Sequence, residues 1–180
     1  EGQTGMTVAG VSQKVMHRYA NWIRENGHVN GGILPPPVTE FCMAKGQNDP
    51  QGRIVVGWMG RPLEDKGLMT LPYLLAENPR FLVRAWTGAE TAGLDYTQRV
   101  QGEAMEAVMK LARKLGVEDR LDIRPLDFNA LSYRHRLEGC HVLLGNSRKE
   151  GFLLTAAEAL SCGIPVVVTK TCGIADFIKG

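Results

Sequence analysis

Residues 141–168 decide the fold, and they read HVLLGNSRKEGFLLTAAEALSCGIPVVV. An apolar run at 141–144 leads into a polar loop, a helical stretch at 155–161 and a second apolar run at 164–168 that is rich in β-branched side chains. A strand, a helix and a second strand in this order are typical of a βαβ unit, in which the two strands lie parallel. This stretch therefore predicts part of a parallel sheet.

The same alternation of strands and helices continues upstream. Further strands are predicted at residues 53–58, 81–86 and 120–123. Further helices are predicted at residues 66–77, 98–115 and 131–137, and from residue 174 onward. An apolar stripe runs along helix 98–115, and Gly116 is predicted to end that helix. Repeated βα units of this kind predict an α/β fold with a Rossmann-like, doubly wound parallel sheet.

The first fifty residues follow a different pattern. A strand at 8–12 and a helix at 13–24 precede residues 31–38, in which three consecutive prolines favour an extended segment and indicate a hinge. The polar stretch at 45–52 then predicts a linker. We therefore expect a small N-terminal unit ahead of the main sheet.

The composition argues against several classes of protein. The 180 residues are 44% hydrophobic and 22% charged, as in soluble globular domains. The net charge of +2 is spread without a basic run, so nucleic acid is not an expected partner. No segment has the length of a membrane span or the pattern of a signal peptide. The four cysteines form no C-x-x-C pair, so we expect no metal, reduced thiols and a cytoplasmic location.

The loop after strand 53–58 carries two cations, Arg61 and Lys66. Ligands of open α/β sheets bind beyond the carboxyl ends of the strands, which is where this loop is expected to lie. A planar guanidinium and a flexible ammonium group together suit a diphosphate. The alternative is that both side chains are simply solvated, which is the commoner state of a loop arginine or lysine.

The loop after strand 141–144 and the helix that follows it carry two carboxylates, Glu150 and Glu158. An ionised carboxylate accepts hydrogen bonds from neighbouring hydroxyl groups, so this pair suits a sugar or a ribose. For Glu158 an equally weighted alternative exists. Thr155 and Glu158 have the spacing of a capping box, in which the glutamate bonds back to the start of its own helix.

Residues 146–178 resemble the hallmark segment of retaining glycosyltransferases of sequence family four, also called group 1 glycosyl transferases. The matching residues are Ser147, Glu150, Gly151, Phe152, Glu158, Ala159, Cys162, Gly163, Pro165, Val166 and Val167. A second element of the family is matched by Gly60-Arg61 and Lys66-Gly67. Val11-Ser12 and Ile33-Leu34-Pro35 resemble its domain-crossing segment, so the ordered matches extend over nearly the whole chain.

This resemblance implies the C-terminal, donor-binding half of a two-domain GT-B enzyme. Residues 1–37 would form the end of the N-terminal domain and the hinge, residues 38–52 a linker, and residues 53–180 the nucleotide-sugar-binding domain, truncated at its C-terminus. The implied partners are a nucleotide-sugar donor and the rest of the N-terminal domain. Any contact with the inner face of a membrane would be made through that other domain.

The resemblance also implies the roles of individual residues. The implied donor site comprises Gly60, Arg61, Lys66, Glu150, Gly151, Phe152, Leu153, Leu154, Thr155 and Glu158. Arg61 and Lys66 would hold the donor diphosphate and, with Glu150, form the catalytic group. Glu150 would bind hydroxyls of the donor sugar, and Glu158 would bind the ribose. The backbone amides of residues 153–155 would face the phosphate or the sugar.

Two positions depart from the family pattern. Leu153 stands where the family usually has glycine, which bears on how closely a ligand approaches the backbone there. Residues 172–176, Cys-Gly-Ile-Ala-Asp, stand in place of a Gly-Gly-x-Pro-Glu element, which leaves the role of Asp176 open.

The implied reaction is transfer of a sugar from a nucleoside-diphosphate sugar to an acceptor with retention of the anomeric configuration. The leaving phosphate would assist deprotonation of the acceptor, and no metal is needed. The chain alone is expected to bind the donor without transferring the sugar. The alternatives are a nucleotide-sugar epimerase on the same fold and a non-catalytic nucleotide-sugar-binding module.

The remaining candidate residues are assigned to packing or to the surface. They are His17, His28, His135, His141, Cys162, Cys172, Trp58, Trp86, Arg148 and Lys149. For Trp86 a contact with the nucleotide base is an alternative, and for Arg148 and Lys149 a contact with phosphate.

Overall fold

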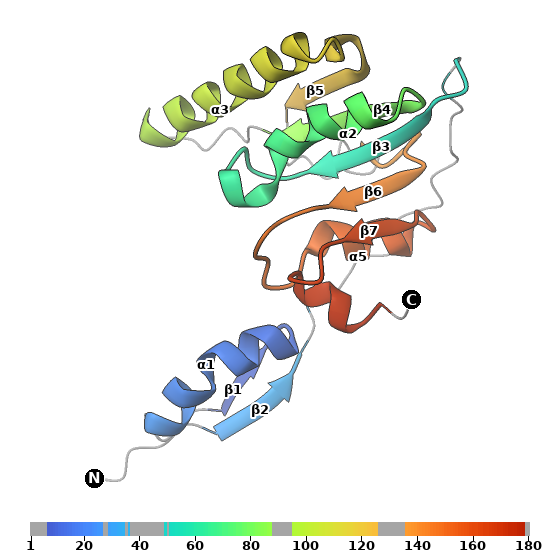
Figure 1. The fold of residues 1–180 in the computed structure, drawn as a ribbon. Coiled ribbons are helices and arrows are strands. Elements are labelled where there is room, and N and C mark those ends of the chain that lie inside the picture. Colours follow the sequence, from blue (N-terminus) through green and yellow to red (C-terminus); the bar gives the residue numbers. More distant parts are fainter. Residues whose placement is uncertain are drawn as a thin grey trace.

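The computed structural model describes residues 7–26, 29–34, 36, 49, 51–87, 95–125 and 136–178. The main part is an α/β domain built on a five-stranded sheet. Figure 1 shows this domain with a smaller N-terminal unit beside it. The main sheet is parallel throughout and has the strand order β5-β4-β3-β6-β7. Its strands are β3 (Ile54–Met59), β4 (Phe81–Thr87), β5 (Leu121–Pro125), β6 (Val142–Gly145) and β7 (Val166–Val168). The predicted Rossmann-like, doubly wound sheet is confirmed.

The strand order places a topological switch point between β3 and β6. The chain begins in the middle of the sheet at β3, moves outward through β4 to β5, and then returns to lay β6 against the other side of β3. Val56 pairs with Val142 and Gly57 with Leu143 across this junction. Where the connections from two adjacent parallel strands run to opposite faces of the sheet, a crevice opens between them. This crevice is the usual ligand position in such folds.

Helices cover both faces of the sheet (Figure 1). Helices α2 (Leu71–Glu77) and α3 (Asp95–Lys114) pack on one face, and α5 (Leu154–Ser161) packs on the other. Successive residues of β3 serve the two faces in turn, because side chains alternate along a strand. Val56 thus joins the cluster under α2 and α3, whereas Val55 joins the cluster under α5.

The predicted end of the long helix is confirmed. Gly116 has a φ of 67°, and its amide donates to the carbonyl of Arg113. The amide of Val117 donates to the carbonyl of Ala112 at 3.0 Å. These two bonds and the left-handed glycine form a Schellman motif, which satisfies the last carbonyls of α3. The chain then continues through a short 3₁₀ turn, η3 (Glu118–Arg120), into β5.

The N-terminal unit consists of β1 (Thr7–Gly10), α1 (Gln13–Glu25) and β2 (Val29–Ile33). The strand and helix predicted at 8–12 and 13–24 are confirmed within two residues. The strand β2 was not predicted, because its sequence VNGGI contains three poor strand formers. Pairing with the parallel strand β1 gives it strand geometry nonetheless.

Side-chain contacts join the N-terminal unit to the main domain. The hydroxyl of Ser12 donates to the carbonyl of Gly151 at 2.8 Å and also accepts from the amide of Val15 as the N-cap of α1. The ammonium group of Lys14 donates to the carbonyl of Cys172 and lies 2.8 Å from a carboxylate oxygen of Asp176. Asp176, whose role the sequence left open, therefore fastens α1 to the main domain.

Two predicted helices are wrong in part. The α-helix predicted at 66–77 begins only at Leu71. Gly67, with a φ of 81°, separates the 3₁₀ turn η1 (Glu64–Lys66) from a second one, η2 (Leu68–Thr70), which leads directly into α2. The helix predicted from residue 174 is a short 3₁₀ helix, η4 (Gly173–Asp176).

Other sequence-based expectations fall on parts of the chain that the structure does not describe. They concern helix 131–137, of which only the last two residues are described, the proline run at 35–37, of which only Pro36 is described, and most of the linker at 38–52. Within the described ranges no helix is long and apolar enough to cross a membrane.

Candidate functional site

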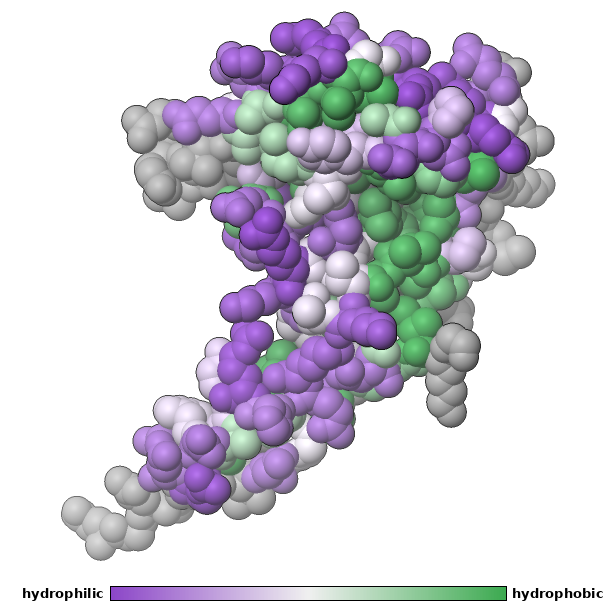
Figure 2. Space-filling model, in the orientation of Figure 1, coloured by the Kyte–Doolittle hydropathy of each residue, from purple (hydrophilic) through white to green (hydrophobic). Residues whose placement is uncertain are grey.

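The loops that follow β3 and β6 meet at the switch point of the sheet. Residues 60–67 leave β3, and residues 146–151 leave β6, so the two loops emerge from neighbouring strands at the same edge. In the space-filling view the surface on this side is hollowed between the N-terminal unit and the upper part of the domain, and hydrophilic residues gather along it (Figure 2). The structure thus brings together the two loops that the sequence singled out.

A partly buried ion pair joins the two loops. The ammonium group of Lys66 lies 2.6 Å from Oε2 of Glu150, and a carboxylate oxygen of Asp65 lies 3.9 Å from the same nitrogen. The side chains of Lys66 and Glu150 are 13% and 27% exposed, so the pair is partly shielded and yet reachable from solvent. Two of the three residues predicted to be catalytic are therefore in direct contact.

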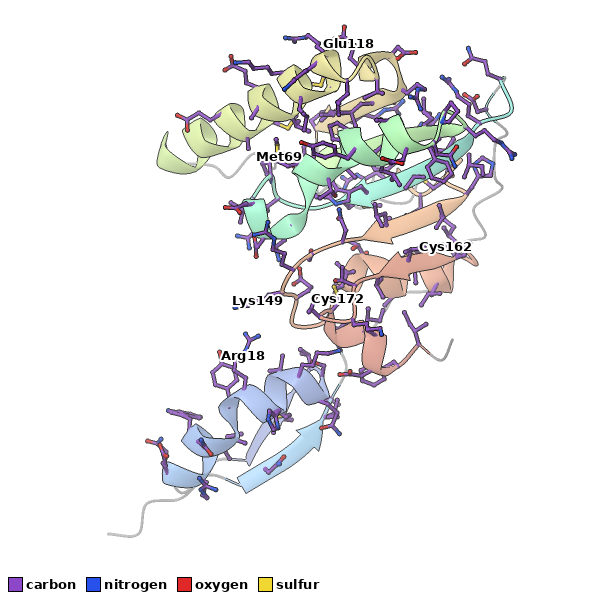
Figure 3. All side chains as sticks on the ribbon, viewed as in Figure 1. Arg18, Met69, Glu118, Lys149, Cys162 and Cys172 are labelled. Atoms are coloured by element: carbon purple, nitrogen blue, oxygen red, sulfur yellow. The ribbon has the colours of Figure 1, made fainter. Side chains whose placement is uncertain are left out.

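Backbone and surface contacts hold the same loops together. The amide of Arg148 donates to the carbonyl of Asp65 at 2.7 Å. The Arg148 guanidinium lies 3.0 Å from Glu64, but both side chains are largely exposed, so this pair adds little stability. Figure 3 shows Lys149 on this loop, on the side of the molecule where Arg18 of α1 also lies.

The segment 150–152 is fixed through its carbonyl groups. The carbonyl of Glu150 accepts from the amide of Gly173, and that of Phe152 accepts from the amide of Ile174 at 2.8 Å. Gly151 uses its carbonyl for the hydroxyl of Ser12. A Cβ at Gly173 would lie 1.9 Å from the oxygen of Gly151, so only glycine fits there. The carbonyls therefore anchor the segment to η4 and to α1.

Leu153 adopts the left-handed conformation that the family's glycine would favour. Its φ is 80° and its ψ is 72°, and it is the one non-glycine residue with positive φ in the described part of the chain. Its side chain lies over Gly145, where a Cβ would approach Cδ2 of Leu153 to 2.3 Å. At this position the side chain thus differs from the family's glycine, but the backbone keeps the left-handed conformation that glycine favours.

The capping-box interpretation of Glu158 is wrong. Leu153, and not Thr155, is the N-cap of α5, and it makes no side-chain cap bond. Thr155 is the second residue of the helix, so Glu158 lies two residues beyond the position that a capping box requires. Glu158 is 8% exposed and lies on the buried side of α5.

Helix α5 follows the loop that leaves β6, and its N-terminus faces the junction between the two loops of the site. Leu154 and Thr155 open this helix, and their amides have no acceptor within it because they belong to its first turn. Such amides, together with the helix dipole, favour an anion. On the other loop, Gly60 donates its amide to the carbonyl of Trp86, and Arg61 is exposed to solvent.

The remaining candidates that the structure describes have the predicted packing or surface roles, whereas His28 and His135 lie outside the described residues. Trp58 and Trp86 are 1% and 5% exposed in the core, which disfavours a base contact by Trp86. His141 accepts from the amide of Val55 through Nδ1 at 2.9 Å. The described cysteines, Cys140, Cys162 and Cys172, are buried, and burial raises the pKa of the Cys140 thiol to about 11. No metal-binding group of histidine, cysteine and carboxylate side chains is present among the described residues.

The sequence did not point to Asn146 as a functional residue. Its side chain bonds to Trp58 of β3 and to the turns around Gly67, and so links both loops of the site. An asparagine in a loop carries no periodic or spacing signal, so only the structure reveals this link.

A comparison with protein-family models gives a match over residues 9–180 to a family described as Family 4 Glycosyltransferase in conflict systems. The chain belongs to this family. The resemblance inferred from the sequence is thereby confirmed, and this family 4 glycosyltransferase chain is homologous to glycosyltransferase enzymes. A search of curated proteins gave no match.

Solved structures share the fold of this glycosyltransferase chain. Sucrose-phosphate synthase from Thermosynechococcus elongatus is 20% identical, with a TM-score of 0.75, over 96% of this chain and 43% of its own. HepE from Anabaena in complex with UDP and glucose is 17% identical, with a TM-score of 0.74, over 97% of this chain and 47% of its own. The chain thus spans less than half the length of these two proteins.

An isolated domain gives a comparison of more similar size. The C-terminal domain of a glycosyl transferase group 1 family protein (LpcC) from Francisella tularensis is 17% identical, with a TM-score of 0.61. The match covers 81% of this chain and 76% of that domain. These likenesses show that the family 4 chain has the fold of one domain, the C-terminal half, of GT-B glycosyltransferases.

Proposed function

We propose that this chain carries the donor site of an enzyme that transfers a sugar from a nucleoside-diphosphate sugar to an acceptor with retention of the anomeric configuration. The observation that carries the proposal is the contact between Lys66 and Glu150 at the switch point between β3 and β6. A nucleotide sugar presents an anionic diphosphate next to a ring of hydroxyl groups. A cation and a carboxylate side by side complement these two parts in turn.

The cationic part of the site is assigned to the diphosphate. Lys66 supplies a partly shielded charge, and the exposed guanidinium of Arg61 closes over the phosphates from the same loop. The first amides of α5 approach from the other loop. As the bond between sugar and phosphate breaks, negative charge grows on the leaving diphosphate, and groups already in place stabilise it without a metal.

The carboxylates are assigned to hydroxyl groups. Glu150 binds hydroxyls of the donor sugar, and its main chain is held in place through three carbonyl bonds of residues 150–152. Glu158 binds the ribose from the flank of α5. The amides of residues 153–155 and the adjoining Gly60, Gly151 and Phe152 complete the site. The oxygen of the leaving phosphate takes part in deprotonating the acceptor.

A thermal-shift experiment tests donor binding. UDP is the first probe, because the similar structure of HepE was solved with UDP and glucose. UDP is expected to raise the melting temperature of the protein in proportion to the logarithm of its concentration, since it binds only the folded state. UMP and uridine should give much smaller shifts. Equal shifts with UDP and uridine would show that the cations do not hold a diphosphate.

The transfer reaction itself is assigned to a longer enzyme, because the similar solved proteins are about twice as long as this chain. A product assay with that enzyme separates the proposal from its rival. A transferase releases free nucleoside diphosphate and a glycoside of unchanged anomeric configuration, whereas an epimerase converts the nucleotide sugar without releasing the nucleotide. Membership of the glycosyltransferase family favours the first outcome.

A further inference from the structure

Asn146 occupies the junction between the two loops of the site. It follows β6 directly, and its amide oxygen accepts from Nε1 of Trp58, a buried residue of β3, at 2.8 Å. Its amide nitrogen donates to the carbonyl of Gly67 at 2.9 Å and to the hydroxyl of Thr70. One side chain thus connects the strand β3, the turns that carry Lys66, and the start of the loop that carries Glu150.

The partners of Asn146 require a side chain that both accepts and donates hydrogen bonds, as an amide does. The Trp58 nitrogen can only donate, and the Gly67 carbonyl can only accept, so the side chain between them must accept on one side and donate on the other. A carboxylate of the same shape would keep the first bond and place an oxygen against the carbonyl. An apolar side chain would lose both bonds and leave the indole nitrogen of Trp58 without its partner.

Gly67 and the side chain of Asn146 are tightly packed against each other. A Cβ at Gly67 would lie 2.6 Å from both Cγ and Nδ2 of Asn146. The turn that follows Lys66 therefore rests directly on the asparagine. Because Lys66 precedes Gly67, a shift of this turn moves the ammonium group away from Glu150.

We propose that Asn146 is a positioning residue whose amide holds the Lys66 turn against the Glu150 loop and so presets the geometry of the donor site. The consequence for nucleotide binding rests on the proposed function, whereas the positioning of Lys66 does not. Asn146 itself need not touch the donor.

Chemical labelling of lysines tests the positioning without any ligand. Asn146→Asp removes the donor while keeping size and the acceptor, and Asn146→Ala removes both without adding charge. Lys66, which is shielded at Glu150, should be acetylated several-fold faster in both variants, whereas the exposed Lys170 should react at an unchanged rate. Asn78→Asp is the matched control, because the side-chain oxygen of Asn78 only accepts from the amide of Arg80. Unchanged labelling of Lys66 in both Asn146 variants would overturn the proposal.

Calorimetry with UDP tests the consequence. Asn146→Ala should weaken binding about tenfold, which is about 1.4 kcal/mol, in the wild-type background. In a Lys66→Ala background it should weaken binding less than about twofold, because a residue that acts through Lys66 has nothing left to position. Equal losses in both backgrounds would refute action through Lys66. If the wild-type protein does not bind UDP, the proposed function fails, and the labelling experiment still decides whether Asn146 positions Lys66.

Discussion

The ammonium group of Lys66 and the carboxylate of Glu150 lie 2.6 Å apart although 84 residues separate them in the chain. The contact exists because β3 and β6 are neighbours in the sheet and release their loops at the same edge. In the ligand-free protein each group neutralises the other. A bound diphosphate must therefore compete with Glu150 for Lys66. The hydroxyls of the sugar must then replace Lys66 as hydrogen-bond donors to the Glu150 carboxylate.

Neutralising Glu150 should separate these two effects. In Glu150→Gln the carboxylate no longer competes for Lys66, so inorganic pyrophosphate should bind a few-fold more tightly than to the wild type. The preference for UDP-glucose over UDP should fall at the same time, because an amide is a weaker acceptor for sugar hydroxyls. Calorimetric titration with the three ligands measures both changes. Glu64→Gln, which neutralises an exposed partner of Arg148, is the control and should change neither. Unaltered binding of all three ligands in Glu150→Gln would contradict the assignment.

A second carboxylate can be tested by the same kind of change. If Glu158 binds the ribose, Glu158→Gln should weaken UDP binding by about 1–3 kcal/mol and leave pyrophosphate binding unchanged, since only UDP carries a ribose. The exposed Glu77, at the end of α2, provides the matched control as Glu77→Gln. Equal UDP affinity in the Glu158 variant and the wild type would remove Glu158 from the site.

The left-handed backbone of Leu153 makes a prediction about stability. Glycine in a helix or strand usually destabilises a protein relative to alanine. At φ 80° the order should reverse, because alanine keeps a strain of about 1–2 kcal/mol that glycine does not have. We expect Leu153→Gly to be more stable than Leu153→Ala by about 1 kcal/mol in urea unfolding, both having lost the same leucine contacts. A less stable glycine variant would show that residue 153 is unstrained in the folded protein.

The carboxylate of Asp49 gives a prediction about pH. Arg53 donates to it through Nε at 3.0 Å and through Nη2 at 3.1 Å, and mainly for this reason the pKa of Asp49 falls from 3.8 to about 2. A carboxyl whose pKa is lower in the folded state binds its proton more readily in the unfolded chain. Its contribution to stability is therefore present above about pH 4 and is lost as the pH falls toward 2.

Urea unfolding of the wild type and of Asp49→Asn measures this contribution. The difference in the free energy of unfolding between the two proteins should be constant from pH 5 to 7 and should shrink below pH 4. A difference that does not depend on pH would mean that the Asp49–Arg53 contact does not stabilise the charged carboxylate.

The main sheet could be predicted from the sequence because its strands carry a strong local signal. Runs such as residues 53–58 are apolar on both sides, as expected of strands covered by helices on both faces. The strand β2 could not be found in this way, since its residues are poor strand formers and only pairing with β1 orders them. The start of α5 was predicted within one residue, but its N-cap could not be identified, because Leu153 is a residue type that seldom adopts positive φ.

The charged residues of the site could be predicted from the sequence, but the residues that hold its loops in place could not. Lys66 and Glu150 stand in loops after strands, so the rule for ligand positions in α/β sheets was enough to select them. Asn146, Ser12 and Gly173 act through contacts with residues distant in the chain, which no local pattern encodes. The break at Gly67 follows from the same kind of contact, because Asn146 occupies the space that a side chain there would need.

Calorimetric titration of UDP into the wild type, Lys66→Ala and Arg61→Ala tests the central claim, that the loop after β3 holds a nucleoside diphosphate. Each loss of a charge-assisted hydrogen bond is expected to weaken binding by about 1–3 kcal/mol, with an almost unchanged melting temperature, because both residues lie in a loop outside the core. Uridine, which lacks phosphate, should not discriminate among the three proteins. UDP affinities that are the same in all three proteins would contradict the account.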